Sequence, residues 1–177
     1  ASTDCSVLYI DDDIGAATGT VAFFDGEDVL FVESGKNGFG TVSAVAAKAN
    51  SMASATVYFG PGSYNLNNTA ENVVLTKNVT LLGNNYDVSA LAINGADWSV
   101  AGRKPETVIN GGFVFESGSS MTVAVKGFTI EGTSLRGPIY INDTTSAEAT
   151  RVTHTQTLDI ENNIITGGGN GQAANPA

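Results

Sequence analysis

An internal repeat of a short strand, a tight corner and a second short strand constrains the fold more than any other feature. Residues 123–132 align without gaps on residues 158–167, at an offset of 158 − 123 = 35 residues. In each copy a charged residue ends the first strand, and Gly127 or Asn162 follows. Glycine and asparagine tolerate the left-handed backbone conformation, so each marks a corner. A recurring corner between strands indicates a coil of parallel sheets, whereas hairpins favour two-residue turns.

A third copy of this unit is expected earlier in the chain. Residues 77–83 resemble residues 126–132 at an offset of 126 − 77 = 49 residues, with Asn78 at the corner position. Both offsets exceed the roughly 20 to 30 residues of a typical solenoid repeat. Because insertions in such folds form loops, we assign the excess to outward loops, of which residues 84–105 and 133–155 are the largest candidates.

The composition is that of a turn-rich β protein. Apolar residues make up 42% of the 177 residues, enough for a core, while only 15% are charged and 21 are glycine. Short runs rich in β-branched or aromatic residues, bounded by Gly, Asn or Asp, predict strands. They are residues 7–10, 21–24, 29–32, 56–59, 73–76, 79–82, 107–110, 113–116, 122–125, 128–131, 138–142, 157–160 and 164–166.

One helix is predicted, over residues 41–49. Apolar residues there follow the i, i+3, i+4, i+7 spacing of one helical face, with Thr41 as N-cap and Asn50 as a stop signal. A helix of about two and a half turns needs tertiary packing to form. Its alanine-rich face suits close packing against the end of a sheet.

The order of segments resembles the opening coils of the pectin-lyase-like family, which includes bacterial surface proteins and polysaccharide-active enzymes. The resemblance covers roughly residues 29–168 and is more specific for fold than for activity. It begins with a strand, a Gly-containing loop, a short helix, a strand and a Pro-Gly-x-Tyr turn, which here are Val29–Glu33, Gly35–Gly40, Thr41–Asn50, Thr56–Phe59 and Pro61-Gly62-Ser63-Tyr64. It continues with the segments Lys77–Gly83, Thr107–Gly112 and Val125–Gly132.

This resemblance implies an all-β fold, a right-handed single-stranded parallel β-helix (a solenoid) of three sheets with a short N-terminal capping helix. The alternation of the strands agrees, since it places aliphatic and aromatic residues inside, namely Val123, Val125, Phe128, Ile130, Leu158, Ile160 and Ile165. We therefore divide the chain into N-terminal strands (1–40), the capping helix (41–50), β-helix coils (51–168) and a flexible tail or truncation point (169–177).

Asp159 and Glu161 are the candidates for catalysis. They alternate on a predicted strand, so both are expected on its outward face, roughly 7 Å apart. Paired carboxylates serve as acid and base in polysaccharide hydrolases, but ordinary outward polar positions explain them as well. The resembled lyases set calcium-binding acids beside a catalytic Arg or Lys, an arrangement that we cannot place in this sequence.

Asp11, Asp12 and Asp13 form the densest acidic cluster. Hard cations such as Ca²⁺ favour several carboxylate and carbonyl oxygens at one point, so the cluster is a candidate calcium site. Successive side chains on a strand face opposite ways, and no EF-hand spacing follows. A solvated acidic turn is the alternative.

Tyr86, Trp98 and Tyr140 are the candidates for ligand binding. Tyr86 and Trp98 lie in the first predicted loop, and Tyr140 follows the second. Exposed aromatic rings stack on sugars, so these loops are candidates for a glycan platform. Alternatively, Trp98 simply anchors its loop on the coils.

The net charge of −10 argues against nucleic-acid partners, which need clustered Lys and Arg, and no apolar run is long enough to span a bilayer. We expect a non-catalytic β-helix region of a secreted or cell-surface bacterial protein, acting as a stalk or an adhesive surface. Its expected partners are a polysaccharide or host glycan and the remainder of the same solenoid. The alternative is the N-terminal part of a polysaccharide lyase or glycoside hydrolase whose active coils lie further along.

Overall fold

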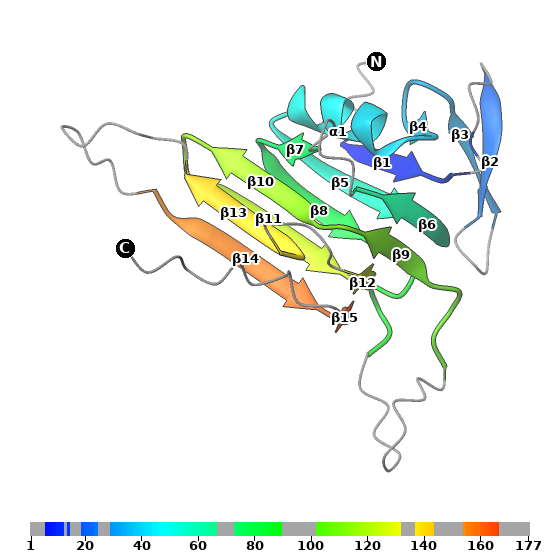
Figure 1. Ribbon diagram of the computed structural model, residues 1–177. Helices are drawn as coiled ribbons and strands as arrows, with labels where there is room; N and C mark the ends of the chain where they lie inside the picture. Colours follow the sequence, from blue (N-terminus) through cyan, green and yellow to red (C-terminus); the bar gives the residue numbers. More distant parts are fainter. Residues whose placement is uncertain are drawn as a thin grey trace, which may run out of the picture.

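The computed structural model contains one helix and fifteen strands in the part of the chain that it describes. That part comprises residues 6–12, 14, 19–24, 29–66, 73–89, 102–131, 137–143 and 154–166. The strands form three parallel sheets and one antiparallel hairpin (Figure 1). The predicted all-β class, with parallel pairing dominant and a single helix, is therefore confirmed for the described residues.

The first sheet has six parallel strands. In spatial order they are β14 (Gln156–Glu161), β11 (Met121–Lys126), β8 (Asn78–Leu82), β5 (Ser54–Phe59), β1 (Val7–Ile10) and β4 (Gly38–Phe39). The second sheet consists of β15 (Ile164–Thr166), β12 (Thr129–Glu131), β9 (Thr107–Asn110) and β6 (Gly62–Asn65). The third sheet consists of β13 (Ile139–Asp143), β10 (Phe113–Ser117) and β7 (Val74–Leu75).

From β5 onward the chain visits the first, second and third sheets in turn, and then begins again. We call one such passage a circuit. Each strand pairs with the strand one circuit earlier, so neighbours in a sheet are far apart in sequence. The strands of the first sheet begin at residues 54, 78, 121 and 156, which gives circuits of 24, 43 and 35 residues. Each circuit contains residues that the structure does not describe, namely 67–72 in the first, 90–101 in the second, and 132–136 and 144–153 in the third.

The alignment at an offset of 35 residues gives the true register. Val123 pairs with Leu158 and Val125 with Ile160, as the alignment predicts. The alignment at 49 residues is wrong, because Val79 pairs with Val123, an offset of 123 − 79 = 44. Residues 78–82 form a strand of the first sheet, whereas 129–131 belong to the second. The two segments share a local pattern but occupy different positions in the circuit.

Two of the three predicted corners are confirmed. Gly127 has a φ of 78° and Asn162 a φ of 58°, both in the left-handed region. Asn78 instead begins β8 and has no positive φ. At Gly127 the backbone of Asn85 and Tyr86 also approaches so closely that a Cβ atom would collide with it. This corner therefore requires glycine for space as well as for conformation.

The interior between the sheets is filled by aliphatic columns and a cluster of phenylalanines. Phe59, Phe113 and Phe128 are buried and contact one another edge to face, with ring centroids 5.2 to 6.2 Å apart. The interior positions predicted for Val123, Val125, Phe128 and Ile130 are confirmed. The same prediction is wrong for three residues of the last circuit, Leu158, Ile160 and Ile165, which are 41%, 42% and 47% exposed.

The helix α1 (Val42–Asn50) has the nine residues predicted for 41–49, shifted by one residue toward the carboxyl end. The hydroxyl of Thr41 accepts a hydrogen bond from the Ala44 amide, which confirms it as the N-cap. Val45, Ala46 and Ala49 are buried. The helix packs on β1, β4, β5 and β7, so it covers the end of the sheets opposite β14 (Figure 1). Among the described residues, no helix has the length and hydropathy needed to cross a membrane.

The hairpin of β2 (Thr20–Phe24) and β3 (Val29–Glu33) was predicted as strands but not as a separate antiparallel sheet. Ile14, Phe23 and Val32 form a small second core that packs on Tyr9 and Tyr58, on the outer face of the first sheet.

A further difference is that Gly62–Asn65, predicted as a turn, forms β6. Strands β1 and β4 join the same sheet as β5.

Candidate binding groove and its supporting network

A row of three tyrosines lies on the outer face of the first sheet. Tyr9 and Tyr58 face each other across β1 and β5, with ring centroids 5.6 Å apart and planes 16° apart. Tyr86, just after β8, contacts Tyr58 edge-on at 5.8 Å. The row faces outward because strand side chains alternate, and the residues flanking Tyr9 and Tyr58 are buried in the interior.

A groove of about 340 Å³ opens beside this row. Its apolar wall comes from the tyrosines and from Phe23 and Leu30 of the hairpin. Asn84 and Lys104 supply the polar part of its lining. Ligand sites combine such an apolar, largely aromatic wall with a few polar groups that fix orientation.

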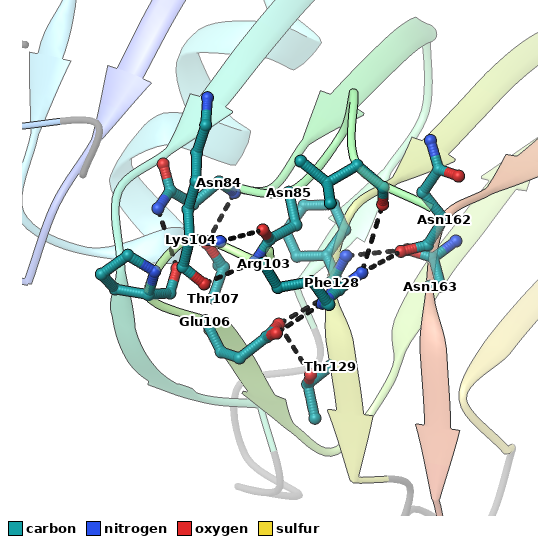
Figure 2. Close-up of polar contacts among 12 residues, drawn as sticks. Asn84, Asn85, Arg103, Lys104, Glu106, Thr107, Phe128, Thr129, Asn162 and Asn163 are labelled. Carbon is teal, nitrogen blue, oxygen red and sulfur yellow. Dashed lines mark hydrogen bonds and ion pairs between the residues drawn. The ribbon is translucent and has the colours of Figure 1, made fainter. Parts of the chain in front are cut away.

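A network of polar side chains supports the side of the groove that carries Tyr86 and Lys104 (Figure 2). Its centre is the ion pair of Arg103 with Glu106, in which Nε and Nη2 donate to the two carboxylate oxygens at 2.5 and 2.8 Å. The Arg103 side chain is only 3% exposed. Its Nη1 also donates to the carbonyl oxygens of Val88, at 3.4 Å, and Asn162, at 3.1 Å. One guanidinium thus joins three separate segments.

Asparagines complete this network. The Asn85 side chain accepts from the Lys104 amide at 2.8 Å and donates to the Lys104 carbonyl at 3.1 Å. Asn84 donates to the carbonyl of Pro105 at 2.8 Å. From the last circuit, Asn162 donates to the Tyr86 carbonyl at 2.7 Å. Side-chain hydrogen bonds therefore hold the backbone carbonyl of Tyr86 and both the amide and the carbonyl of Lys104.

The electrostatics of the network favour an ionised Glu106. Partial burial acts to raise the pKa of Glu106, but hydrogen bonds from Arg103 and Thr129 and the Arg103 charge outweigh it and lower the pKa below its ordinary value. Thr129 donates to the carboxylate at 3.0 Å. Lys104, at the groove, lies 3.7 Å from the Asp87 carboxylate.

Asp159 and Glu161 share the outward face of β14, as predicted. They lie beside a lysine and do not line the groove. The ammonium of Lys126 lies 2.7 Å from Asp159 and 3.0 Å from Glu161. Hydrogen bonds to both carboxylates raise the pKa of Lys126. The arrangement is an ion-pair cluster on an exposed sheet face.

Of the three candidate calcium ligands, the structure describes Asp11 and Asp12, and their surroundings differ. Asp11 is buried, with its carboxylate against the backbone of Gly60, whereas Asp12 is exposed. Asp13 lies outside the described residues. Within the described ranges, no three His, Cys, Asp or Glu side chains gather in a way that could hold a metal ion.

The structure places Tyr86 and Tyr140, two of the three predicted aromatic residues, in different sheets or their margins. Tyr86 lines the groove, whereas Tyr140 is half-buried on β13 in the third sheet, and Trp98 lies outside the described residues. Tyr9 and Tyr58 were missed by the sequence analysis. The signal that would have found them is alternation, because each is the polar-tipped aromatic between aliphatic or aromatic neighbours of a strand.

Comparison with known proteins adds no relative: no protein-family model, no curated protein and no solved structure matches this chain.

Proposed function

We propose that this chain is a non-catalytic part of a secreted or cell-surface protein, a right-handed parallel β-helix that serves as a stalk and binds a glycan on its side. The observation that carries the proposal is the row of Tyr9, Tyr58 and Tyr86 beside an open groove. The groove is the binding site in this proposal.

The cyclic order of the strands supports the β-helix. A chain that passes through three parallel sheets in turn, with each strand beside its counterpart one circuit earlier, winds around a common axis. Connections between parallel strands are right-handed in about 98% of cases. The aliphatic columns inside are what stacked coils bury. Such rods hold side groups at fixed positions, which suits a stalk.

The chemistry of the groove supports a sugar ligand. Tyrosine presents an apolar ring with a polar tip, so it packs against the C–H face of a sugar and still reaches a hydroxyl group. The ammonium of Lys104 adds hydrogen-bond donors at the groove. Because the backbone at Tyr86 and Lys104 is already fixed, binding does not need to order it, which reduces the entropy cost.

The proposal is tested by binding of the chain to a panel of polysaccharides, with and without Ca²⁺, by affinity electrophoresis and calorimetry. Tyr86→Ala should weaken binding about tenfold, as expected for the loss of about 1.4 kcal/mol from a contact residue. Tyr140→Ala is the matched control in another sheet and should bind normally. Equal losses for both variants, or no binding to any glycan, would contradict the proposal.

The same incubations distinguish the enzyme alternative. New reducing ends or unsaturated products should not appear. Turnover that is lost in Asp159→Asn or Glu161→Gln would make those carboxylates the active site and would favour a lyase or hydrolase.

A further inference from the structure

The corner after β14 contains Asn162, whose φ of 58° lies in the left-handed region. Among the described residues, every other residue with a positive φ is a glycine. One circuit earlier the equivalent corner position is held by Gly127, with a φ of 78°. Glycine adopts this conformation without the steric cost that asparagine has. The turn itself therefore does not require the asparagine side chain, and a residue held in such a conformation is a reason to look for a function of that side chain.

The Asn162 side chain reaches the backbone of a groove residue. Its Nδ2 donates to the Tyr86 carbonyl oxygen at 2.7 Å. Asn162 follows β14 and Tyr86 follows β8, and β11 lies between these two strands in the first sheet. The bond thus joins two corners that strand pairing does not connect directly. At the corner between them, the Tyr86 backbone approaches Gly127 so closely that a side chain at 127 would collide with it.

The Asn162 backbone is itself held in place. Its carbonyl oxygen accepts from Nη1 of the buried Arg103 at 3.1 Å, and Arg103 is paired with Glu106 (Figure 2). Asn162 therefore connects the ion pair to Tyr86, through its backbone on one side and its side chain on the other. The Tyr86 ring lines the groove and contacts the Tyr58 ring edge-on at 5.8 Å, whereas Asn162 does not line the groove.

We propose that Asn162 is a positioning residue for the groove. It holds the Tyr86 backbone, and with it the Tyr86 ring, where a bound sugar meets the ring, and it does not touch the sugar. Its effect on affinity rests on the proposed function, whereas its effect on Tyr86 does not. The net contribution of one hydrogen bond corresponds to a shift of about two- to tenfold in an equilibrium. Apparent affinity falls with the fraction of molecules in the competent state, so the loss should be of that order.

Asn162→Gly isolates this contact. Glycine suits a φ of 58°, so the turn is kept, and the backbone carbonyl that accepts from Arg103 is kept as well. The bond from Nδ2 to the Tyr86 carbonyl is lost.

Asn163→Ala is the matched control at the same corner. The Asn163 side chain also donates to a backbone carbonyl at 2.7 Å, that of Val125, and it accepts from the Phe128 amide at 2.9 Å. Neither Val125 nor Phe128 lines the groove. This variant disturbs the corner at least as much as Asn162→Gly does, but it leaves the bond to Tyr86 in place. Far-UV circular dichroism and urea titration check that both variants fold and how much stability each loses.

The first measurement follows the Tyr86 ring without any ligand. The 177-residue chain is labelled with fluorotyrosine, and the fluorine NMR signal of Tyr86 is assigned with Tyr86→Phe. Because the Tyr58 ring lies edge-on to Tyr86, the signal is sensitive to the orientation of the Tyr86 ring. We expect this signal to shift or broaden in Asn162→Gly and to stay in place in Asn163→Ala, while the Tyr140 signal stays in place in both.

The second measurement is calorimetric binding of soluble neutral and uronate oligosaccharides. Affinity should fall about three- to tenfold in Asn162→Gly and should be unchanged in Asn163→Ala, even if Asn163→Ala is the less stable variant. An unchanged Tyr86 signal in Asn162→Gly, equal changes in the two variants, or a changed signal with unchanged affinity would each overturn the proposal. If the wild-type chain binds no oligosaccharide, the proposed function fails, and the Tyr86 signal alone decides whether Asn162 positions the ring.

Discussion

Ile130 and Ile165 allow the effect of burial on the free energy of unfolding to be measured within one molecule. They pair with each other on β12 and β15 and differ in burial, with Ile130 at 0% and Ile165 at 47% exposure. Replacing isoleucine with alanine removes three carbons, at about 0.8 kcal/mol each when buried. For Ile130 this gives about 2.4 kcal/mol, and the cavity raises the cost to about 3–4 kcal/mol, within the usual range of 2–5 kcal/mol.

For Ile165 about half of the removed surface is already exposed, so the transfer cost falls to roughly 1.3 kcal/mol and no closed cavity forms. The two variants should therefore differ by about 2 kcal/mol in the free energy of unfolding. Urea titration followed by circular dichroism measures the difference. Equal costs would show that Ile165 is covered in solution, and a larger cost for Ile165 would refute the assigned interior.

Three further predictions concern the network and the corners. Glu106→Gln should lower stability at neutral pH by roughly 2 kcal/mol, because buried Arg103 loses its charged partner. Because its folded pKa is lowered, Glu106 contributes stability that is complete above the ordinary value of 4.5 and is lost as the pH falls through the folded value, so urea midpoints from neutral to acidic pH should fall less steeply in Glu106→Gln. Gly127→Ala should cost at least about 1–3 kcal/mol in the same titration, because φ is 78° and the backbone of Tyr86 leaves no room, while Lys126→Ala, at an exposed ion pair, should leave the urea midpoint nearly unchanged.

The sequence predicted most strands and the helix, because neighbouring residues determine where each of these elements begins and ends. The alternation and bounding turn residues placed most strands within two residues, and the N-cap and apolar spacing placed α1. The repeat at 35 residues gave the register of β11 and β14, since both copies occupy the same position in the circuit. The repeat at 49 residues failed because strands of different sheets share the same aliphatic alternation, and sequence similarity does not distinguish them.

The burial of the last circuit and the position of the groove could not be predicted in the same way. A residue such as Ile160 has the pattern of an interior position, but its burial depends on whether another strand follows it in space. The groove brings together Tyr9 from β1, Tyr58 from β5 and Tyr86 from just after β8, with a hairpin folded over the sheet. Such contacts between distant segments are set by the order in which the chain passes through the sheets, which has no local signature in the sequence.

Because α1 covers one end of the sheets, we expect the chain to fold from that end toward the other. Among the parallel strand pairs, the partners on β9 and β12 are closest in sequence, at 129 − 108 = 21 residues for Val108 and Thr129. Every such pairing therefore requires a long loop to close first. In the described part of the chain, α1 packs on β1, β4, β5 and β7 and covers that end of the sheets. Growth is then expected to start there and to proceed one circuit at a time toward the carboxyl end, with each new edge serving as the template for the next.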